Sequence, residues 1–267
     1  MSYVEKVPPL DAHVAREMKL FVGSVDKAFL ILESFSSQHH RLTLTQLASL
    51  TGLDNSSLQR FLHTLVTLGY LRKDINRQYG LTPKILNLGT NYLRTNELVE
   101  RATPYLQIAH AKSSETINLI EMDGLDTVFV IRFLAEHPVN IWLLGSRTPV
   151  YCSAAGRIML AYMPQAWASD LLDRSDKKAF TKKTLTTTKA IMAEVHAART
   201  LGYAVSDEEF MLGDVSVAAP VFNQSGQIIA AVSVAASVDR WRSAKVRQKL
   251  VQLAIDSARL ISRGHPN

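Results

Sequence analysis

Apolar side chains in the first third of the chain recur every three to four residues, which predicts three helices. The first spans residues 24–36 and has a serine available as its N-cap. A shorter helix follows Thr43 and ends at Thr51-Gly52, because glycine lets the backbone reverse there. The third begins after Asp54 or Asn55. The positions expected to form the core are Val25, Ala28, Phe29, Leu32 and Phe35; Leu44, Leu47 and Ala48; and Leu58, Phe61, Leu62, Leu65 and Leu68.

The opposite side of the third helix is polar and carries no acid. Two helices joined by a tight glycine turn, the second with such a surface, are typical of a helix-turn-helix that reads the major groove of DNA. Gln59 can pair bidentately with adenine and Arg60 with guanine. Further candidate contacts to DNA are Ser56, Ser57 and His63 on the same helix and Thr45 on the second helix.

Residues 71–81 alternate around a polar turn, which predicts a two-stranded wing. Arg72, Lys73 and Arg77 near its tip would neutralise DNA phosphates, a contribution that weakens steeply with salt. A winged domain that binds another protein instead of DNA would show the same pattern, so that alternative stays open. Pro83 then opens a linker helix with apolar residues on more than one face, which favours packing against a partner chain.

Helical and alternating stretches are mixed in the other two thirds. Strands are expected at 116–121 and 127–131 around an Asp-Gly turn, at 140–144, and at 216–222 and 227–237. Helices are expected at 104–114, 153–163, 190–201 and from residue 239 onward, the last packing Val246, Leu250, Leu253, Leu260 and Ile261. Helices segregated from an antiparallel sheet indicate an α+β domain.

Two segments of this domain could hold a ligand. Residues 151–157 read Tyr-Cys-Ser-Ala-Ala-Gly-Arg and join a strand to a helix, so free backbone amides at the helix start would accept a carboxylate. Residues 206–209 read Ser-Asp-Glu-Glu and could accept hydrogen bonds from a ligand hydroxyl. A hydrolase acting through Ser153 or these acids is the weaker alternative, because Ser153 lies in no Gly-x-Ser-x-Gly elbow and no histidine shows a triad pattern.

Composition narrows the class of protein. Apolar residues are 47% and charged residues 20% of the 267, which is ordinary globular usage and excludes a fibrous chain. The net charge of +6 makes nucleic acid a possible partner. The lone Cys152 excludes an internal disulfide or a thiolate zinc cluster and fits a reducing cytoplasm as a buried small side chain. We expect no metal, no cofactor, no secretory signal and no membrane span.

Four separated segments, in this order, resemble bacterial transcriptional regulators of the IclR type. They read SVDKAFLIL (24–32), GLDNSSLQRFL (52–62), YCSAAGR (151–157) and GYAVSDEE (202–209). The resemblance covers residues 24–241 and implies an α+β fold: a flexible arm at 1–19, a winged helix-turn-helix at 20–82, a linker helix at 83–101 and a GAF-like effector domain at 102–267. Residues 81–89 look closest to members that govern aromatic-acid catabolism.

The resemblance also implies an effector pocket between the last two segments. Its expected lining is Ser153, Ala154, Ala155, Gly156, Asp207, Glu208, Ser216 and Ser233. Arg157 stands where the family usually has lysine, and Ser216 where some members have cysteine. The expected function is a cytoplasmic regulator, activator or repressor, that binds double-stranded operator DNA as a homodimer or homotetramer and responds to a small carboxylic acid.

Overall fold

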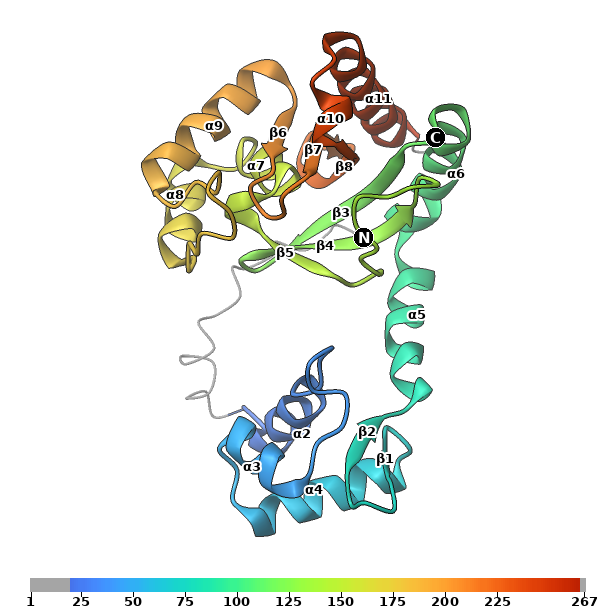
Figure 1. Cartoon of the computed structure of the whole chain (residues 1–267), viewed down its shortest axis with the longest axis vertical. Helices are drawn as coiled ribbons and strands as arrows, with labels where there is room; N and C mark the ends of the chain where they lie inside the picture. The colour runs from blue at the N-terminus through green and yellow to red at the C-terminus, as the bar shows by residue number, and fades with distance from the viewer. Residues whose placement is uncertain (1–19, 265–267) are drawn as a thin grey trace. The chain divides into compact units, whose positions relative to one another are not determined.

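The computed structural model describes residues 20–264, so the predicted N-terminal arm at 1–19 lies outside the described residues. Two compact units divide the chain between Tyr92 and Leu93 (Figure 1). The first unit contains three helices, α2 (Gly23–Glu33), α3 (Leu44–Thr51) and α4 (Asn55–Thr67), followed by the hairpin β1 (Leu71–Lys73) and β2 (Tyr79–Leu81). This is the predicted order of elements for a winged helix-turn-helix.

Local interactions explain where the two central helices begin and end. Thr43 and Gln46 form a capping box at the start of α3, and Gly52, with φ of 68°, ends it in the left-handed conformation. Asp54 caps α4 by accepting the amide of Ser57 at 2.8 Å. The turn between the helices is therefore fixed by one glycine and two caps.

The core of the first unit differs from the predicted set on α2. Val25 and Phe29 are 53% and 50% exposed, whereas Ile31, which the pattern missed, is fully buried. Successive helical residues are about 100° apart, so Phe29 lies almost opposite Ile31. Val22 rather than Ser24 is the N-cap, and Leu68 of the third helix is also exposed. The buried set is Ile31, Leu42, Leu47, Leu58, Leu62, Leu65, Leu71 and Tyr79.

The linker is not one helix over 83–101. A short 3-10 turn, η1 (Pro83–Ile85), leads into α5 (Leu86–Thr95), and α6 (Glu97–Ser113) then contains Pro104 in its interior instead of starting there. Asn96 makes the break between α5 and α6: its side-chain oxygen accepts the amides of Leu98 and Val99. Its amide nitrogen also donates to Glu121 at 2.8 Å.

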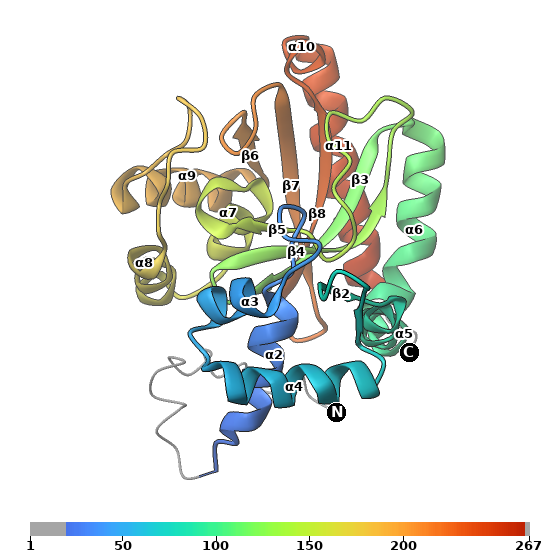
Figure 2. The same cartoon turned by 60° about the horizontal axis from the view of Figure 1, so that its bottom comes forward.

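A six-stranded antiparallel sheet forms the centre of the second unit (Figure 2). Its strand order is β5-β4-β3-β8-β7-β6. The strands are β3 (Thr116–Asp123), β4 (Asp126–Phe133), β5 (Arg147–Pro149), β6 (Ala204–Asp207), β7 (Asp214–Phe222) and β8 (Ile228–Ser237). The predicted strand at 140–144 is wrong, because these residues belong to the irregular connection between β4 and β5.

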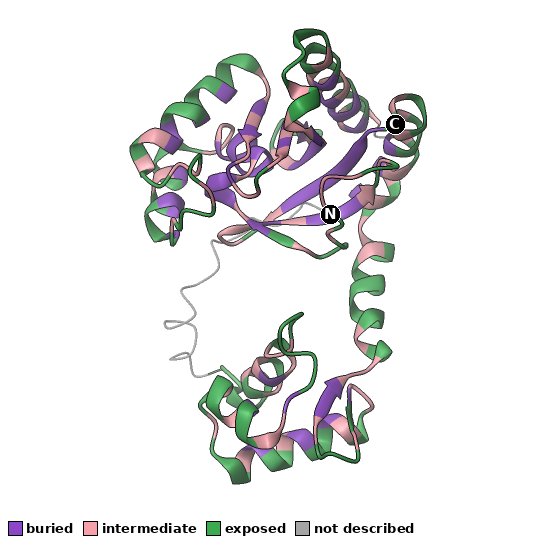
Figure 3. Cartoon of the chain, in the orientation of Figure 1, coloured by how far each residue is buried: buried purple, intermediate pink, exposed green. Residues whose placement is uncertain are grey.

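Helices cover both faces of this sheet. On one face lie α6 and α11 (Ala244–Arg263), which follows the short α10 (Val238–Trp241). On the other lie η2 (Val150–Cys152), α7 (Ala154–Leu160), α8 (Gln165–Arg174) and α9 (Thr188–Leu201). Of these helices, the sequence pattern did not predict α8. Leu260, predicted in the core, is 51% exposed. The strands are mostly buried on both sides (Figure 3), so a polar side chain inside one of them stands out.

Candidate DNA-binding surface and effector pocket

The outward side of α4 presents the predicted reading residues together. Ser56, Gln59, Arg60 and His63 are exposed and lie at spacings of three and four, so they share one helical face. Thr45 is exposed near the start of α3. Ser57 is half-buried because it belongs to the cap of α4. The structure thus offers a continuous polar face without carboxylates among these side chains.

The wing places three cations in solvent. Arg72, Lys73 and Arg77 are exposed, and the turn between β1 and β2 is held by Asp74, which accepts the amides of Asn76 and Gln78 at 2.9 Å. These backbone hydrogen bonds, with the Arg41 guanidinium, lower the pKa of Asp74. Arg77 has a φ of 60°, a left-handed conformation that is unfavourable for a residue with a Cβ.

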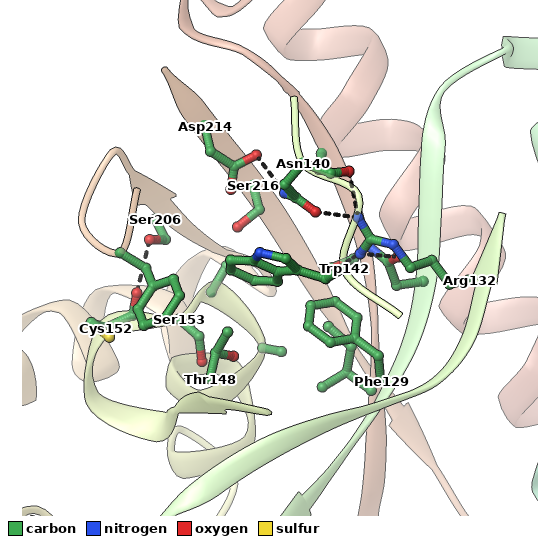
Figure 4. A pocket seen from close by; sticks show the side chains of 17 residues that line it. Phe129, Arg132, Asn140, Trp142, Thr148, Cys152, Ser153, Ser206, Asp214 and Ser216 are labelled. Atoms are coloured by element: carbon green, nitrogen blue, oxygen red, sulfur yellow. Dashed lines mark hydrogen bonds between the residues drawn. The ribbon is translucent and has the colours of Figure 1, made fainter. Parts of the chain in front are cut away.

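A pocket lies between the sheet and the start of α7 (Figure 4). Five of the eight predicted effector residues line it: Ser153, Ala154, Ala155, Ser216 and Ser233. The other residues around it come from all six strands of the sheet, from η2, and from the β4–β5 and β6–β7 connections.

Three polar side chains form a hydrogen-bonded row across the sheet at the pocket floor. Arg132 on β4 pairs in register with Asn118 on β3, which pairs with Ser233 on β8. A guanidinium nitrogen of Arg132 donates to Asn118 Oδ1 at 3.0 Å, and Asn118 Nδ2 donates to Ser233 Oγ at 3.0 Å. Burial lowers the pKa of Arg132, which is the only cationic side chain of this lining within residues 20–264.

Asn140 connects Arg132 to an acid on the neighbouring wall. Its side-chain oxygen and its backbone oxygen both accept from Arg132, the latter at 3.2 Å, and its Nδ2 donates to Asp214 at 3.4 Å (Figure 4). Burial raises the pKa of Asp214 to about 6, against the lowering effects of Arg132 and Asn140. Asp214 therefore changes its charge close to physiological pH.

Aromatic rings form the middle of the pocket. Trp142 makes edge contacts with Phe129 and Phe210, at centroid separations of 5.7 and 5.1 Å. The Arg132 guanidinium carbon lies 5.0 Å from the centre of the Phe129 ring. A planar ring would therefore meet aromatic surface next to a cation.

The start of α7 supplies backbone donors at another part of the lining. The Ser153 hydroxyl accepts the amide of Gly156 at 3.0 Å, and Ala154 and Ala155 are the first two helical residues, whose amides have no carbonyl partner within the helix. Gly156 itself does not line the pocket. A Cβ on it would lie 2.2 Å from the Val150 carbonyl oxygen, so this glycine serves the close packing of α7 against η2.

The predicted acids Asp207 and Glu208 also lie outside the pocket lining. Lys183 pairs with both of them, and its hydrogen bond is the main cause of a lowered pKa for Glu208. Glu208 adopts a φ of 56° and accepts the amide of Gly213 at 2.7 Å, so it closes the β6–β7 connection. These carboxylates are occupied in holding the loop, which is why they do not face the cavity.

Two further residues of the predicted segment 151–157, Arg157 and Cys152, are buried and have structural roles. Arg157 is buried and forms an ion pair with Glu209, and it also donates to the Val205 carbonyl at 2.9 Å. Cys152 is fully buried, and burial raises the pKa of its thiol to about 12. The thiol is therefore protonated at neutral pH, in agreement with the interpretation as a buried small side chain.

Sequence reasoning missed the pocket residues that lie far from the two expected segments. Asn118 and Arg132 had a usable signal: each is a polar residue between two apolar neighbours in its strand. Asn140 and Trp142 had none, because they lie in an irregular segment. Asp214 stands at the start of β7, where an acid is unremarkable.

A helix-turn-helix unit joined to a unit whose pocket is lined by a cation and aromatic rings is typical of ligand-responsive transcriptional regulators. Family comparisons agree with this: residues 24–74 match the IclR helix-turn-helix domain, and residues 90–263 match the C-terminal domain of the bacterial transcriptional regulator IclR. The chain belongs to the IclR family and is a DNA-binding transcriptional regulator, not an enzyme.

Individual relatives point the same way. The Pca regulon regulatory protein of Pseudomonas putida is 32% identical over 94% of this chain and 89% of its own length. The crystal structure of a transcriptional regulator from Rhodococcus sp. RHA1 has a TM-score of 0.79 at 30% identity, covering 91% of this chain and 98% of that one. An IclR homologue of Microbacterium hydrocarbonoxydans, solved with 4-hydroxybenzoate, shares the fold with a TM-score of 0.74 at 20% identity, covering 90% and 97%.

No helix within residues 20–264 is both long enough and apolar enough to span a membrane.

Proposed function

We propose that this regulator responds to an aromatic carboxylic acid bound in the pocket beside Arg132. The observation that carries the proposal is the combination of a half-buried arginine with three aromatic rings in one cavity. A relative that regulates a Pca regulon and a homologue solved with 4-hydroxybenzoate support this class of ligand. Operator DNA is the proposed macromolecular partner, so the proposed place of action is the cytoplasm.

The charges of the pocket favour one orientation of the acid. Arg132 offers a full positive charge and several donors, and charge-assisted hydrogen bonds to a carboxylate are about twice as strong as neutral ones. The short helix α7 offers only the neutral amides of Ala154 and Ala155 near the Ser153 hydroxyl. We therefore place the carboxylate on Arg132, the ring against Phe129 and Trp142, and a ring hydroxyl toward the start of α7.

Calorimetric titration of the full chain with 4-hydroxybenzoate tests this function. We expect binding of one molecule per chain, a higher melting temperature in its presence, and a changed affinity for the protein's own promoter DNA. 4-Hydroxybenzyl alcohol, which keeps the ring and its hydroxyl but has no carboxylate, is the matched control ligand and should not bind measurably. Equal binding of the two compounds, or of neither, would contradict the proposal.

Arg77→Gly tests the wing as a phosphate contact without straining the turn. Glycine adopts the observed φ of 60° freely, so the variant removes one charge while the hairpin keeps its conformation. We expect weaker DNA binding and a plot of log affinity against log salt that is shallower by about one unit. The slope is measured by fluorescence anisotropy between roughly 50 and 200 mM salt. An unchanged slope would exclude Arg77 from the interface with DNA.

Acid binding should strengthen as the pH falls through the pKa of Asp214, about 6. Protonation removes a negative charge from the pocket while a benzoic acid stays ionised, and a unit charge several Å away contributes roughly 1–2 kcal/mol. We expect about tenfold tighter binding at the acid end of a titration across this pKa, and no such dependence in Asp214→Asn.

The raised pKa of Asp214 in the folded state also means that ionisation of this carboxyl destabilises the fold. The contribution of Asp214 to the free energy of unfolding therefore decreases from about pH 4 to 6 and is constant above.

We propose that the protein binds DNA as a homodimer or a tetramer built from dimers. Apolar side chains on α2 and α5 are exposed: Val25, Phe29, Leu86, Leu88 and Tyr92. An exposed apolar surface of this kind fits a contact between copies, which a two-fold operator requires. Sedimentation velocity is the measurement, and a strictly monomeric species at micromolar concentration would contradict the proposal.

A further inference from the structure

A second cavity lies directly beside the effector pocket. Four residues line both cavities: Arg132, Asn140, Asp214 and Ala235. The rest of its lining is mixed: Thr116, Ser237 and the ion-paired Glu115 and Arg240 lie beside apolar residues, which are Ala135, Pro138, Val139 and Ala236. The four shared residues therefore form the partition between the two cavities.

Asn140 is the part of this partition that is not fixed in the sheet. Arg132, Asp214 and Ala235 lie on β4, β7 and β8, whereas Asn140 lies in the irregular connection between β4 and β5. Its side chain crosses the partition, accepting from Arg132 on one side and donating to Asp214 at 3.4 Å on the other (Figure 4). The bond to Asp214 is long, and the bond to Arg132 is one that a ligand carboxylate can replace with a charge-assisted bond.

We propose that Asn140 is the specificity-determining residue of the pocket: its side chain separates the two cavities and excludes acids whose carboxylate extends past Arg132. This inference rests on the proposed acid-binding function. A short acid reaches Arg132 from the effector pocket with Asn140 in place. An acid with a longer arm between ring and carboxylate must occupy the position of the Asn140 side chain, and it gains the space of the second cavity only if that side chain leaves.

A series of three acids measures this effect: 4-hydroxybenzoate, 4-hydroxyphenylacetate and 3-(4-hydroxyphenyl)propionate, which differ only in the length of the arm. We expect the full-length wild-type chain to bind the first most tightly in calorimetric titration. Asn140→Ala should reverse this order and shift the affinity ratio of the longest to the shortest acid by at least tenfold. Asn140→Ser, with a smaller change in volume and polarity, should shift the ratio in the same direction by less.

Asn118→Ala is the matched control. Asn118 also accepts a hydrogen bond from Arg132, but it lines only the effector pocket. We expect this variant to weaken all three acids in parallel, with their ratios unchanged within about threefold. An unchanged order in both Asn140 variants, with melting temperatures near that of the wild type, overturns the inference, and so does the same reversal in Asn118→Ala. If the wild-type chain binds none of the three acids, the acid-binding function itself fails.

Discussion

Replacing Gln59 and Arg60 together by alanine is expected to lower the affinity for the protein's own promoter DNA by about 100-fold or more. Each bidentate contact to a base contributes roughly 1–3 kcal/mol, and every 1.4 kcal/mol is tenfold. Both side chains are exposed on the outer face of α4, away from the buried Leu58 and Leu62. The double variant should therefore fold normally and lose affinity for specific DNA, measured by fluorescence anisotropy at one fixed salt concentration.

Arg174→Ala provides the charge-matched control for this experiment. Arg174 is an exposed arginine of the second unit, paired with Asp170 at 3.0 Å on α8. Its removal also lowers the net charge by one, and DNA affinity should stay within about threefold of the wild type. If the double variant keeps its affinity as well, the proposed reading surface on α4 is wrong, and the base contacts must come from other residues of the DNA-binding unit.

Arg132→Leu is expected to abolish acid binding, with at least 100-fold weaker affinity for 4-hydroxybenzoate, while specific DNA binding in the absence of acid remains. Leucine fills much of the volume but offers neither charge nor donors, and a carboxylate buried without a partner is strongly unfavourable. The substitution also leaves Asn118 and Asn140 without a hydrogen-bond donor they now have. The melting temperature should therefore be recorded alongside the calorimetric titration.

Arg132→Lys separates charge from geometry. Lysine keeps the positive charge but loses the planar set of donors, so about tenfold weaker binding is expected instead of complete loss. Should Arg132→Leu bind the acid as tightly as the wild type, the carboxylate must lie elsewhere. The amides of Ala154 and Ala155 at the start of α7 would then be the site, and Ala155→Phe would be the variant that removes it.

The DNA-binding unit was largely predictable because its signals are local. Thr43, Gly52 and Asp54 act within a few residues of their own positions, so caps and turns can be read from one sequence. The errors on α2 arose because periodicity identifies an apolar stripe but not which of its residues the neighbouring helices cover. Val25 and Phe29 are exposed, whereas Leu32 and Phe35 of the same stripe pack against the core together with the buried Ile31.

The effector pocket was only partly predictable because it is assembled from distant residues. Ser153, Ala154 and Ala155 follow one another along the chain, and Ser216 and Ser233 came from the family resemblance. Arg132 and Asn118 meet only through the register of β3 with β4. Asp207 and Glu208 failed because a lysine from another segment, Lys183, pairs with both, which no spacing in the sequence reveals.

Strand β3 carries two contacts whose positions differ by three residues. Asn118 holds Arg132 at the pocket floor, and Glu121 accepts the Asn96 amide at the break between α5 and α6. Ile117 and Leu119 on the same strand belong to the core that α6 packs against. Strand β3 therefore contributes both to the effector pocket and to the anchorage of the break between α5 and α6.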